Sequence, residues 1–374
     1  MAKRILVTST DLMMVQFLLP HIINLSENGY EVEIACSVVG GRIDEIREKL
    51  NGYVKKIHTV RLVRSPVNPI NFKGYGDVKQ IINNGHYDII WTNEPVMGVT
   101  VRLAARKARK NGTKVMYMVH GFHFYKGAPL LNWMVYYPIE KMMANKADLI
   151  TTINREDYKM AQTFNVPRVE YIHGIGINTE RLTRSENAID IRKELGLSPD
   201  DFIVISVGEL NKNKNQKVII KAIAQLNDPK IHYILCGKGD QLENLQSLVK
   251  ECGLEDRVHF LGYRKDVVDI ISQADVFAMP SKREGLPVAS LEAMYCGLPL
   301  VNSNIRGLED VTENGKSGYT CDPDDVDAFA NSIHRIALDK ELRDEMEQNN
   351  TKTVMCFCVD STKREVMSIL NRCL

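Results

Sequence analysis

The segment PSKREGLPVASLEAMYCGLPLV, residues 280–301, is the stretch from which the fold class of this chain can be predicted. Pro287 suits the first turn of a helix, and the apolar residues after it recur at helical spacing, so a helix is predicted to begin there. Apolar runs at residues 274–279 and 298–301 flank this helix and are typical of strands buried in a parallel sheet. The segment therefore predicts a strand, a loop, a helix and a second strand of an α/β fold.

Two glutamates of this segment, Glu284 and Glu292, lie in the predicted loop and in the predicted helix respectively. Because a helix rises 1.5 Å per residue, their carboxylates can stand roughly 10 Å apart along one line. That is about the span of a sugar joined to a diphosphate. Free backbone amides at Gly285, Leu286 and Val288 would face the negative part of such a ligand. The alternative is a solvated loop and an exposed helix face, which is the commoner setting for two glutamates.

The E-x7-E spacing followed by EAMxxGxP resembles the donor site of retaining GT-B glycosyltransferases of family 4, the glycosyl transferases group 1, in their exopolysaccharide and capsule branch. The resemblance implies an α/β fold of the GT-B class, in which two Rossmann-like, doubly wound domains face each other across a cleft. It also implies that Glu284 is catalytic and holds the transferred sugar, and that Glu292 holds the ribose of the donor. Gly285, Leu286 and Pro287 would then lie around the donor as well.

The length of 374 residues, with 44% apolar residues, favours two domains of ordinary size. We predict an N-terminal, acceptor-binding Rossmann-like domain at residues 1–185 and a nucleotide-sugar-binding Rossmann-like domain at residues 186–352. The linker is expected in the polar stretch 179–193. A C-terminal helix at residues 353–374 is expected to return to the first domain, as is frequent in this family.

The N-terminal domain begins with a predicted strand at residues 4–8, a helix that ends near residue 25, and a second strand at residues 31–36. A dinucleotide site would need a glycine-rich turn after the first strand, but the turn STDLM at residues 9–13 has no glycine. This excludes an ordinary NAD-binding domain. Family 4 enzymes often carry a glycine pair in this turn, so no phosphate contact is predicted for it here.

A histidine follows a further predicted strand at residues 114–119. His120 lies at the carboxyl end of that strand, where α/β sheets bind ligands. The family resemblance implies that His120 is a catalytic residue that faces the sugar, and His123 competes for this role. The aromatic segment that contains Phe122, His123 and Lys126 is predicted to be mostly core and partly an acceptor-binding or membrane-facing surface.

The second domain begins with a predicted strand at residues 202–207 followed by GELNKNKN. A strand, Gly208 and a lysine-bearing loop before a helix are typical of a phosphate cradle. The family pattern here is close to GRLxxxKG, in which Lys214 matches the lysine, Glu209 replaces the arginine and Asn215 replaces the glycine. Part of the diphosphate charge must therefore be met by another group. The nearest basic residues in the sequence are Lys212, Lys282 and Arg283.

Two further pairs of residues concern the nucleotide base and a metal. Tyr263 and Arg264 lie where the family contacts the base of the donor. Asp322 and Asp324 have the D-x-D spacing of metal-dependent glycosyltransferases, but the proline between them and the helix pattern after them favour a loop and helix-cap role. The eight cysteines include no C-x-x-C pair and indicate reduced thiols. We assign no metal and no cofactor, since the substrate itself is a nucleotide-sugar.

The charge balance bears on the partners. A formal net charge of +1 leaves no overall field that would attract nucleic acid. The predicted helix at residues 99–110 carries five basic side chains, Arg102, Arg106, Lys107, Arg109 and Lys110. A solvated basic face is the simpler interpretation, and contact with anionic lipid headgroups is the alternative. No segment reaches the ~18 apolar residues that a membrane-spanning helix needs. We therefore expect a cytoplasmic protein, with peripheral binding to the inner face of the cell membrane as an open alternative.

The leading hypothesis is a metal-independent, retaining hexosyltransferase that uses a nucleotide-sugar, in particular a UDP-sugar. Its acceptor would be a hydroxyl of a glycan, with a lipid-linked glycan of surface polysaccharide synthesis in first place. One alternative is a GT-B sugar-nucleotide epimerase or hydrolase, and another is a non-catalytic, donor-binding partner of a polysaccharide assembly complex. Glu209 keeps the second alternative open, whereas the joint presence of His120, Lys214, Glu284 and Glu292 favours an enzyme.

Overall fold

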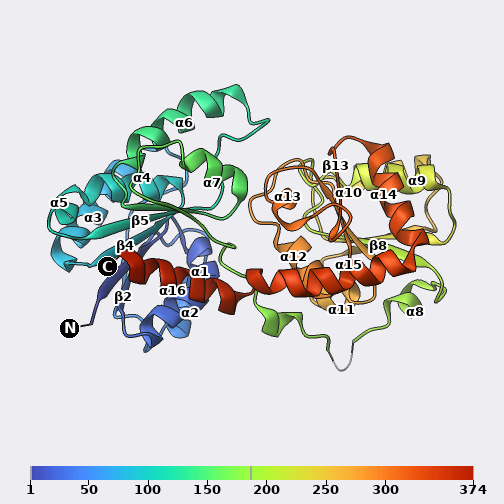
Figure 1. Ribbon diagram of the computed structural model, residues 1–374, viewed down its shortest axis with the longest axis horizontal. Helices are drawn as coiled ribbons and strands as arrows, with labels where there is room; N and C mark the ends of the chain where they lie inside the picture. The colour runs from blue at the N-terminus through green and yellow to red at the C-terminus, as the bar shows by residue number, and fades with distance from the viewer. Residues whose placement is uncertain (1, 186–187, 374) are drawn as a thin grey trace. The chain divides into compact units, whose positions relative to one another are not determined.

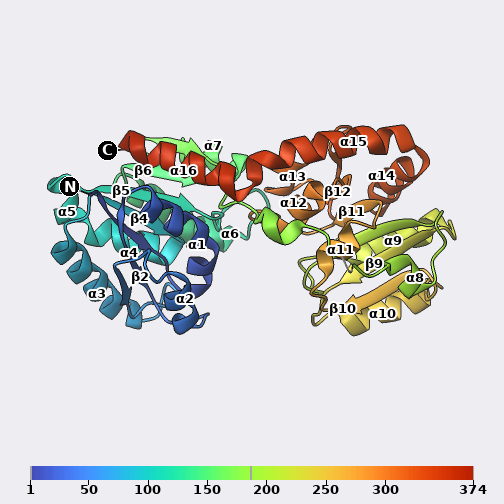
Figure 2. The same ribbon diagram turned by 90° about the horizontal axis from the view of Figure 1, so that it is seen from below.

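The computed structural model describes residues 2–185 and 188–373, which fall into two compact units (Figure 1, Figure 2). The first unit comprises Met1–Gly176 with Val359–Leu374, and the second comprises Ile177–Cys358. The chain thus enters the second unit before the predicted limit at residue 185 and leaves it after the predicted limit at residue 352. Residues 186 and 187 lie outside the described residues; the second domain was predicted to begin there, and they also belong to the predicted linker.

The first unit is built on a seven-stranded sheet in the order β3-β2-β1-β4-β5-β6-β7, with every neighbouring pair parallel. Strand order therefore reverses between β1 and β4, and this reversal is the topological switch point of the sheet. The strands are β1 Arg4–Thr8, β2 Glu31–Cys36, β3 Lys56–Thr59, β4 Ile89–Asn93, β5 Lys114–Val119, β6 Leu149–Thr152 and β7 Val169–Tyr171.

Helices of the first unit connect these strands and cover the sheet (Figure 1, Figure 2). They are α1 Leu12–Glu27, α2 Ile43–Lys49, α3 Ile70–Gly85, α4 Pro95–Ala104, α5 Arg106–Lys110, α6 Leu130–Ala144, α7 Arg155–Ala161 and α16 Val359–Cys373. The C-terminal helix α16 packs against α1, and the Tyr30 hydroxyl donates to the Asn371 side chain at 3.1 Å. The predicted single helix at residues 99–110 is in fact two, because the chain breaks at Ala105 between α4 and α5.

The second unit has a six-stranded parallel sheet in the order β10-β9-β8-β11-β12-β13, and its order reverses between β8 and β11. The strands are β8 Phe202–Val207, β9 Ile231–Cys236, β10 Val258–Gly262, β11 Val276–Met279, β12 Leu300–Ser303 and β13 Gly318–Cys321. The helices are η1 Thr179–Leu182, α8 Ile191–Leu195, α9 Lys217–Leu226, α10 Leu242–Glu251, α11 Val267–Ile271, α12 Val288–Tyr295, α13 Leu308–Val311, α14 Val326–Leu338, α15 Lys340–Thr353 and η2 Val354–Phe357.

The strand sequences explain why both sheets are covered on two faces. In β8, Phe202 and Val204 contribute to one apolar core, with helices α9 and α14, while Ile203 and Ile205 contribute to another, with helix α12. A strand that is apolar at successive positions must be buried on both sides, which is typical of parallel sheets. The predicted α/β class with two doubly wound sheets is thereby confirmed. Among the described residues, every helix is too short or too polar to cross a membrane.

Candidate functional site

The switch point of the second unit brings together two loops that the sequence singled out. One follows β8 and contains Gly208 and Lys214, and the other follows β11 and contains Glu284. They are tied by two hydrogen bonds: the Lys282 amide donates to the Asn213 carbonyl at 2.8 Å, and the Asn213 side chain donates to the Arg283 carbonyl at 3.0 Å. Because ligands of α/β sheets bind at the carboxyl ends of strands where the order reverses, this is the expected ligand site of the unit.

The central contact of these loops is an ion pair between Lys214 Nζ and Glu284 Oε1, 2.7 Å apart. Only 22% of the Lys214 side chain and 13% of the Glu284 side chain are exposed, so solvent screens this pair less than a surface pair. Gly208 has φ 149°, which side chains rarely adopt, and a β-carbon there would lie 3.5 Å from Lys214 Cε. That distance is ordinary van der Waals contact, so the position favours glycine because of its backbone conformation and not because of the lysine.

The two departures from the family pattern have local explanations. Asn215 adopts φ 57°, the left-handed conformation that asparagine tolerates better than most residues, and its side chain donates to the Pro323 carbonyl at 2.7 Å. Glu209 is exposed and accepts a hydrogen bond from the Asn211 side chain at 2.9 Å. Asn215 thus adopts a backbone conformation that glycine also adopts readily, and the Glu209 side chain is bonded to Asn211 at the surface.

Glu292 lies in helix α12, as predicted, and is partly buried. Burial raises the pKa of its carboxyl group, and within residues 2–185 and 188–373 no hydrogen-bond or ionic partner reaches that carboxylate. Val288 does not have the free amide that was predicted, because its N–H donates to the Leu286 carbonyl at 3.0 Å in the turn before the helix. The unpartnered carboxylate leaves Glu292 able to accept hydrogen bonds from a ligand diol.

Tyr263 and Arg264 follow β10, which is the edge strand and is separated from β8 by β9. The Tyr263 side chain is 70% exposed. The Arg264 guanidinium is held by the carboxylates of Asp266, at 2.7 and 2.8 Å, and Glu194, at 2.9 Å. These residues therefore lie at the same carboxyl edge of the sheet as the loop that carries Lys214, but two strands away from β8.

The D-x-D pair serves the loop before α14. The Asp322 side chain accepts the Asp324 amide at 3.1 Å, and the Asp324 carboxylate pairs with Lys282 at 2.8 Å. The residue that caps α14 is Asp325, whose side chain accepts the Ala328 amide at 2.9 Å. The predicted helix-cap role was thus assigned to the wrong aspartates, since the cap lies immediately after the D-x-D.

At the switch point of the first unit, His120 is fixed by Asn93. His120 Nε2 lies 2.9 Å from the Asn93 side-chain oxygen, and the Asn93 side-chain nitrogen donates to the Thr8 carbonyl at 3.2 Å. Since the Asn93 oxygen can only accept, Nε2 carries the proton and Nδ1 is left as an acceptor. Burial, and then the neighbouring His21, lower the pKa of His120 to about 4, so the imidazole is neutral at pH 7.

Three further polar residues gather at this switch point, and no sequence pattern had indicated them. Arg64 is hydrogen-bonded to the Asp11 carboxylate and lies 3.8 Å from Glu94 Oε1, while Glu94 Oε2 accepts the Thr10 amide at 2.8 Å. Burial and the Asp11 charge raise the pKa of Glu94. Glu94 follows strand β4 directly, so the rule that selected His120 would also have selected Glu94.

The backbone of Glu94 is strained. Its φ of 64° and ψ of 154° lie in a region that is essentially restricted to glycine and costs about 1–3 kcal/mol in other residues. Strain of this kind persists where the surrounding structure fixes it, and it is concentrated at ligand sites. A largely buried, strained carboxylate beside a neutral histidine is therefore a candidate for contact with a substrate hydroxyl.

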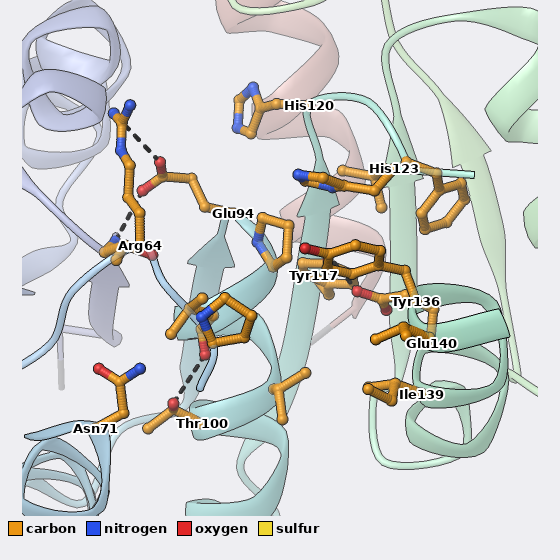
Figure 3. A pocket seen from close by; sticks show the side chains of 18 of the residues that line it. Arg64, Asn71, Glu94, Thr100, Tyr117, His120, His123, Tyr136, Ile139 and Glu140 are labelled. Carbon is orange, nitrogen blue, oxygen red and sulfur yellow. Dashed lines mark hydrogen bonds and ion pairs between the residues drawn. The ribbon is translucent and has the colours of Figure 1, made fainter. Parts of the chain in front are cut away.

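Glu94, Arg64 and His120 border a groove of about 790 Å³ that lies within the first unit (Figure 3). Two of the predicted acceptor residues, Phe122 and His123, also line it, and the His123 ring stacks on Tyr136 with centroids 4.6 Å apart. Lys126 is exposed and is not among the lining residues; its amide donates to Glu156 at 2.7 Å. The groove is mostly apolar away from Glu94 and His120.

The predicted basic face at residues 99–110 is wrong for Arg102. Its side chain is fully buried and forms an ion pair with Glu140 at 2.8 Å. Arg109 is partly buried and pairs with Asp148 at 2.8 Å. Only Arg106, Lys107 and Lys110 are exposed. The exposed positive charge of this segment is therefore smaller than its sequence suggests and lies on helix α5.

Comparison with known proteins matches both halves of the chain to models of glycosyltransferases. Residues 21–181 match the model for Glycosyltransferase Family 4, and residues 187–353 match the model for Glycosyl transferases group 1. The proposed glycosyltransferase EpsD of Bacillus subtilis (strain 168) is 37% identical over 377 residues, which cover 99% of this chain and 96% of that protein.

Two more distant relatives are informative. The UDP-Gal:alpha-D-GlcNAc-diphosphoundecaprenol alpha-1,3-galactosyltransferase of Escherichia coli is 26% identical and covers 85% of this chain and 83% of its own length. The crystal structure of Anabaena Alr3699/HepE in complex with UDP and glucose is similar in fold, with a TM-score of 0.76, 21% identity, and coverage of 99% of this chain and 100% of that one. The fold is thus of the GT-B class, and the chain belongs to glycosyltransferase family 4, the glycosyl transferases group 1.

Proposed function

We propose that this protein is a retaining, metal-independent hexosyltransferase that moves a sugar from a UDP-sugar to a hydroxyl of a lipid-linked glycan. The reaction would serve surface polysaccharide synthesis, such as that of capsule or exopolysaccharide, in the cytoplasm at the inner face of the cell membrane. The observation that carries the proposal is the Lys214–Glu284 pair with the unpartnered Glu292 in the next helix. The Anabaena structure with UDP and glucose supports the donor class, and the diphosphoundecaprenol acceptor of the Escherichia coli relative supports the acceptor class.

The ion pair suggests how the donor is received. A diphosphate carries more negative charge than one carboxylate, so it competes with Glu284 for the Lys214 ammonium group. Once displaced from the lysine, the Glu284 carboxylate can accept hydrogen bonds from the sugar, while Glu292 accepts those of the ribose diol. Lys214 then neutralises charge that increases on the diphosphate as it leaves, which makes a metal ion unnecessary in this proposal.

The proposed transfer breaks the bond between the anomeric carbon and the diphosphate oxygen, and the electron pair leaves with the diphosphate. The acceptor oxygen bonds to the same carbon on the same face, and its proton passes to the leaving phosphate. In the first unit, Nδ1 of neutral His120 and the Glu94 carboxylate can each accept a hydrogen bond from a sugar hydroxyl. We assign them to hydroxyl groups of the substrates.

Measurement of UDP release tests this function. A panel of UDP-sugars is incubated with and without a lipid-linked acceptor, in excess EDTA, and both UDP and the product glycan are quantified. Acceptor-dependent release in EDTA is expected. UDP release at the same rate with and without acceptor would indicate a hydrolase. Donor binding without any UDP release would indicate a non-catalytic partner. Loss of transfer in EDTA that manganese or magnesium restores would show that the metal assignment is wrong.

Glu292→Ala is expected to weaken UDP binding roughly 10- to 100-fold, since a hydrogen bond to a charged group contributes about 1.5–3 kcal/mol. The fold should not be destabilised. The raised pKa of Glu292 means that folding disfavours its charged form, so removing it at pH 7 is neutral or stabilising. Calorimetric titration with UDP gives the affinity, and Glu251→Ala, an exposed residue of α10, is the control. Equal affinity in Glu292→Ala and parent would remove the ribose assignment.

Glu94→Gly is expected to lower turnover about tenfold while leaving the melting temperature unchanged or raised. Glycine relieves about 1–3 kcal/mol of backbone strain, which offsets the loss of the hydrogen bond to Thr10. Asn227→Gly is the matched control, because Asn227 is also a non-glycine residue at positive φ but caps α9 in the second unit. Full turnover in Glu94→Gly would mean that the strained carboxylate has no role in the reaction.

A further inference from the structure

The groove of the first unit has two chemically different parts (Figure 3). Arg64, Glu94 and His120 gather on one side of it, whereas Thr100 and Ile139 lie on the opposite side in this view. Helices α3, α4 and α6 supply most of the second part, through Phe72, Tyr75, Val99, Leu103, Val135 and Ile139. The groove is therefore polar where it meets the switch point and apolar beyond it.

Several of the polar side chains that reach the apolar part are already bonded within the protein. The Thr100 hydroxyl donates to the Val96 carbonyl at 2.8 Å, and the Tyr117 hydroxyl donates to Glu140 at 3.1 Å. Glu140 in turn pairs with Arg102. A glycan buried here would replace few of the hydrogen bonds that it makes to water, which is costly, whereas a hydrocarbon chain would gain from leaving water.

The groove continues onto an exposed apolar surface of α6. Val135 and Ile139 both line the groove and are 41% and 37% exposed. Next to them, the same helix exposes Leu130, Leu131, Met134 and Met142 to 76%, 68%, 69% and 63%. A helix with its apolar residues on the outside of a unit needs a partner.

Charge at the ends of this surface indicates what the partner is. No charged residue occurs at positions 127–139, and exposed lysines, Lys126 and Lys141, flank the stretch on both sides. Trp133, Tyr136 and Tyr137, whose rings are amphipathic, lie between them. An apolar face bordered by lysines and aromatic rings complements a bilayer, in which acyl chains lie beneath anionic headgroups.

We infer that the apolar part of this groove binds the hydrocarbon chain of the acceptor lipid, which enters from the bilayer along the outer face of α6. The headgroup then lies at Arg64, Glu94 and His120. This inference rests on the proposed function for the identity of the acceptor. The hydrocarbon chain of the acceptor lipid therefore adds to the affinity that the glycan provides. A water-soluble analogue of the acceptor, which has no long hydrocarbon chain, lacks that contribution.

The test compares two acceptors with one headgroup, one on a long polyprenyl chain and one on a short, water-soluble alkyl chain. Phe72→Gln and Leu103→Gln change groove residues that are 82% and 42% exposed, so folding should be preserved. Each is expected to lower kcat/KM for the long-chain acceptor about tenfold, a loss of about 1.4 kcal/mol, and to leave the short-chain value unchanged. Leu338→Gln, 72% exposed in the second unit, is the control. Equal effects on both acceptors, or none on either, would overturn the inference.

A binding measurement separates this inference from the proposed function. Calorimetry with farnesyl diphosphate, without donor, should show binding to the parent protein and weaker binding to the double variant Phe72→Gln, Leu103→Gln. Lipid binding without any sugar transfer would mean that the groove is assigned correctly and the reaction is not. Transfer that persists while the parent fails to bind the probe, with equal kcat/KM for the two acceptors, would mean the reverse.

The outer face of α6 is tested with vesicles of phosphatidylethanolamine and phosphatidylglycerol. The double variant Leu131→Glu, Met134→Glu should lose most of the co-sedimentation of the parent and keep its turnover with the short-chain acceptor. The parent protein could instead fail to bind the vesicles and form a dimer in analytical ultracentrifugation that the double variant abolishes. In that case the outer face of α6 binds a second copy of the chain, and the proposed lipid entry is wrong.

Discussion

Replacing Lys214 by alanine is expected to lower sugar transfer at least about 100-fold, the usual effect of losing one preorganised charge-stabilising group. Lys214 is a cation at the switch point of the second unit, and its 2.7 Å contact with Glu284 shows that its ammonium group already lies beside a negative charge. In the proposed reaction the diphosphate takes that place and gains negative charge as it leaves. Without the lysine, this charge would meet Glu284 instead.

Initial rates of UDP release at saturating donor measure the effect. Lys212→Ala is the matched control, since Lys212 is an exposed lysine of the same loop. The melting temperature must be followed too, because Lys214→Ala leaves Glu284 partly buried without its partner. Glu209→Arg should be neutral or mildly activating, as Glu209 is exposed and its side chain is hydrogen-bonded only to Asn211 among the described residues.

One result would relocate the phosphate site. Lys282 and Arg283 precede Glu284 in the loop after β11, and Lys282 pairs with Asp324. Full turnover in Lys214→Ala together with loss of turnover in Lys282→Ala or Arg283→Ala would assign the diphosphate to that loop. The correspondence between GELNKNKN and the family pattern would then be wrong.

Much of the fold follows from short-range patterns. The predicted strands at Arg4–Thr8, Glu31–Cys36 and Phe202–Val207 have the bounds that the structure gives them. In Arg4–Thr8 and Phe202–Val207, apolar and β-branched residues follow one another, and such a run can be buried only between two layers of helices. The loop and helix that carry Glu284 and Glu292 were predicted from another short-range pattern, a proline followed by apolar residues at helical spacing.

Contacts between distant residues could not be predicted in this way. Arg64 is hydrogen-bonded to Asp11, 53 positions away in the sequence, and no pattern in the turn at residues 9–13 predicts this contact. In the sequence, the absence of glycine in this turn was used only to exclude a phosphate contact. In the structure, Asp11 of the turn belongs to a polar cluster with Arg64 and Glu94. The strain at Glu94 is likewise a property of tertiary structure, since a residue before proline usually prefers extended backbone at negative φ.

Arg102 shows why a charge pattern alone misleads. In VTVRLAARKARK the five basic residues form one cationic stretch, but Arg102 is on the buried side of α4 with Val101 and Ala105. Its partner Glu140 lies 38 positions further on, in a helix whose sequence was interpreted only as an aromatic segment. A buried arginine can be recognised from sequence only when its counter-charge is recognised as well.

Arg102→Met is expected to lower the free energy of unfolding of the first unit by about 3–5 kcal/mol. The Arg102 guanidinium pairs with Glu140 at 2.8 Å, donates to the Gly98 carbonyl at 2.9 Å and lies 4.1 Å from the centroid of the Tyr117 ring. Methionine fills similar volume but leaves the Glu140 carboxylate buried, with only the Tyr117 hydroxyl to bond it among the described residues. Removing one partner of a buried pair costs far more than the pair contributes.

Urea denaturation followed by tryptophan fluorescence measures this effect in the right unit, since both tryptophans, Trp91 and Trp133, belong to the first unit. Arg109→Met is the matched control: its pair with Asp148 is about a quarter exposed, so its loss should cost clearly less than the loss of the fully buried Arg102 pair. The double variant Arg102→Met, Glu140→Leu should recover most of the lost stability, because it leaves no unpaired charge. Glu140 and Tyr117 also line the groove. If Arg102→Met is as stable as Arg109→Met, water reaches Glu140 from the groove. The apolar part of the groove is then more hydrated than the binding of a hydrocarbon chain requires.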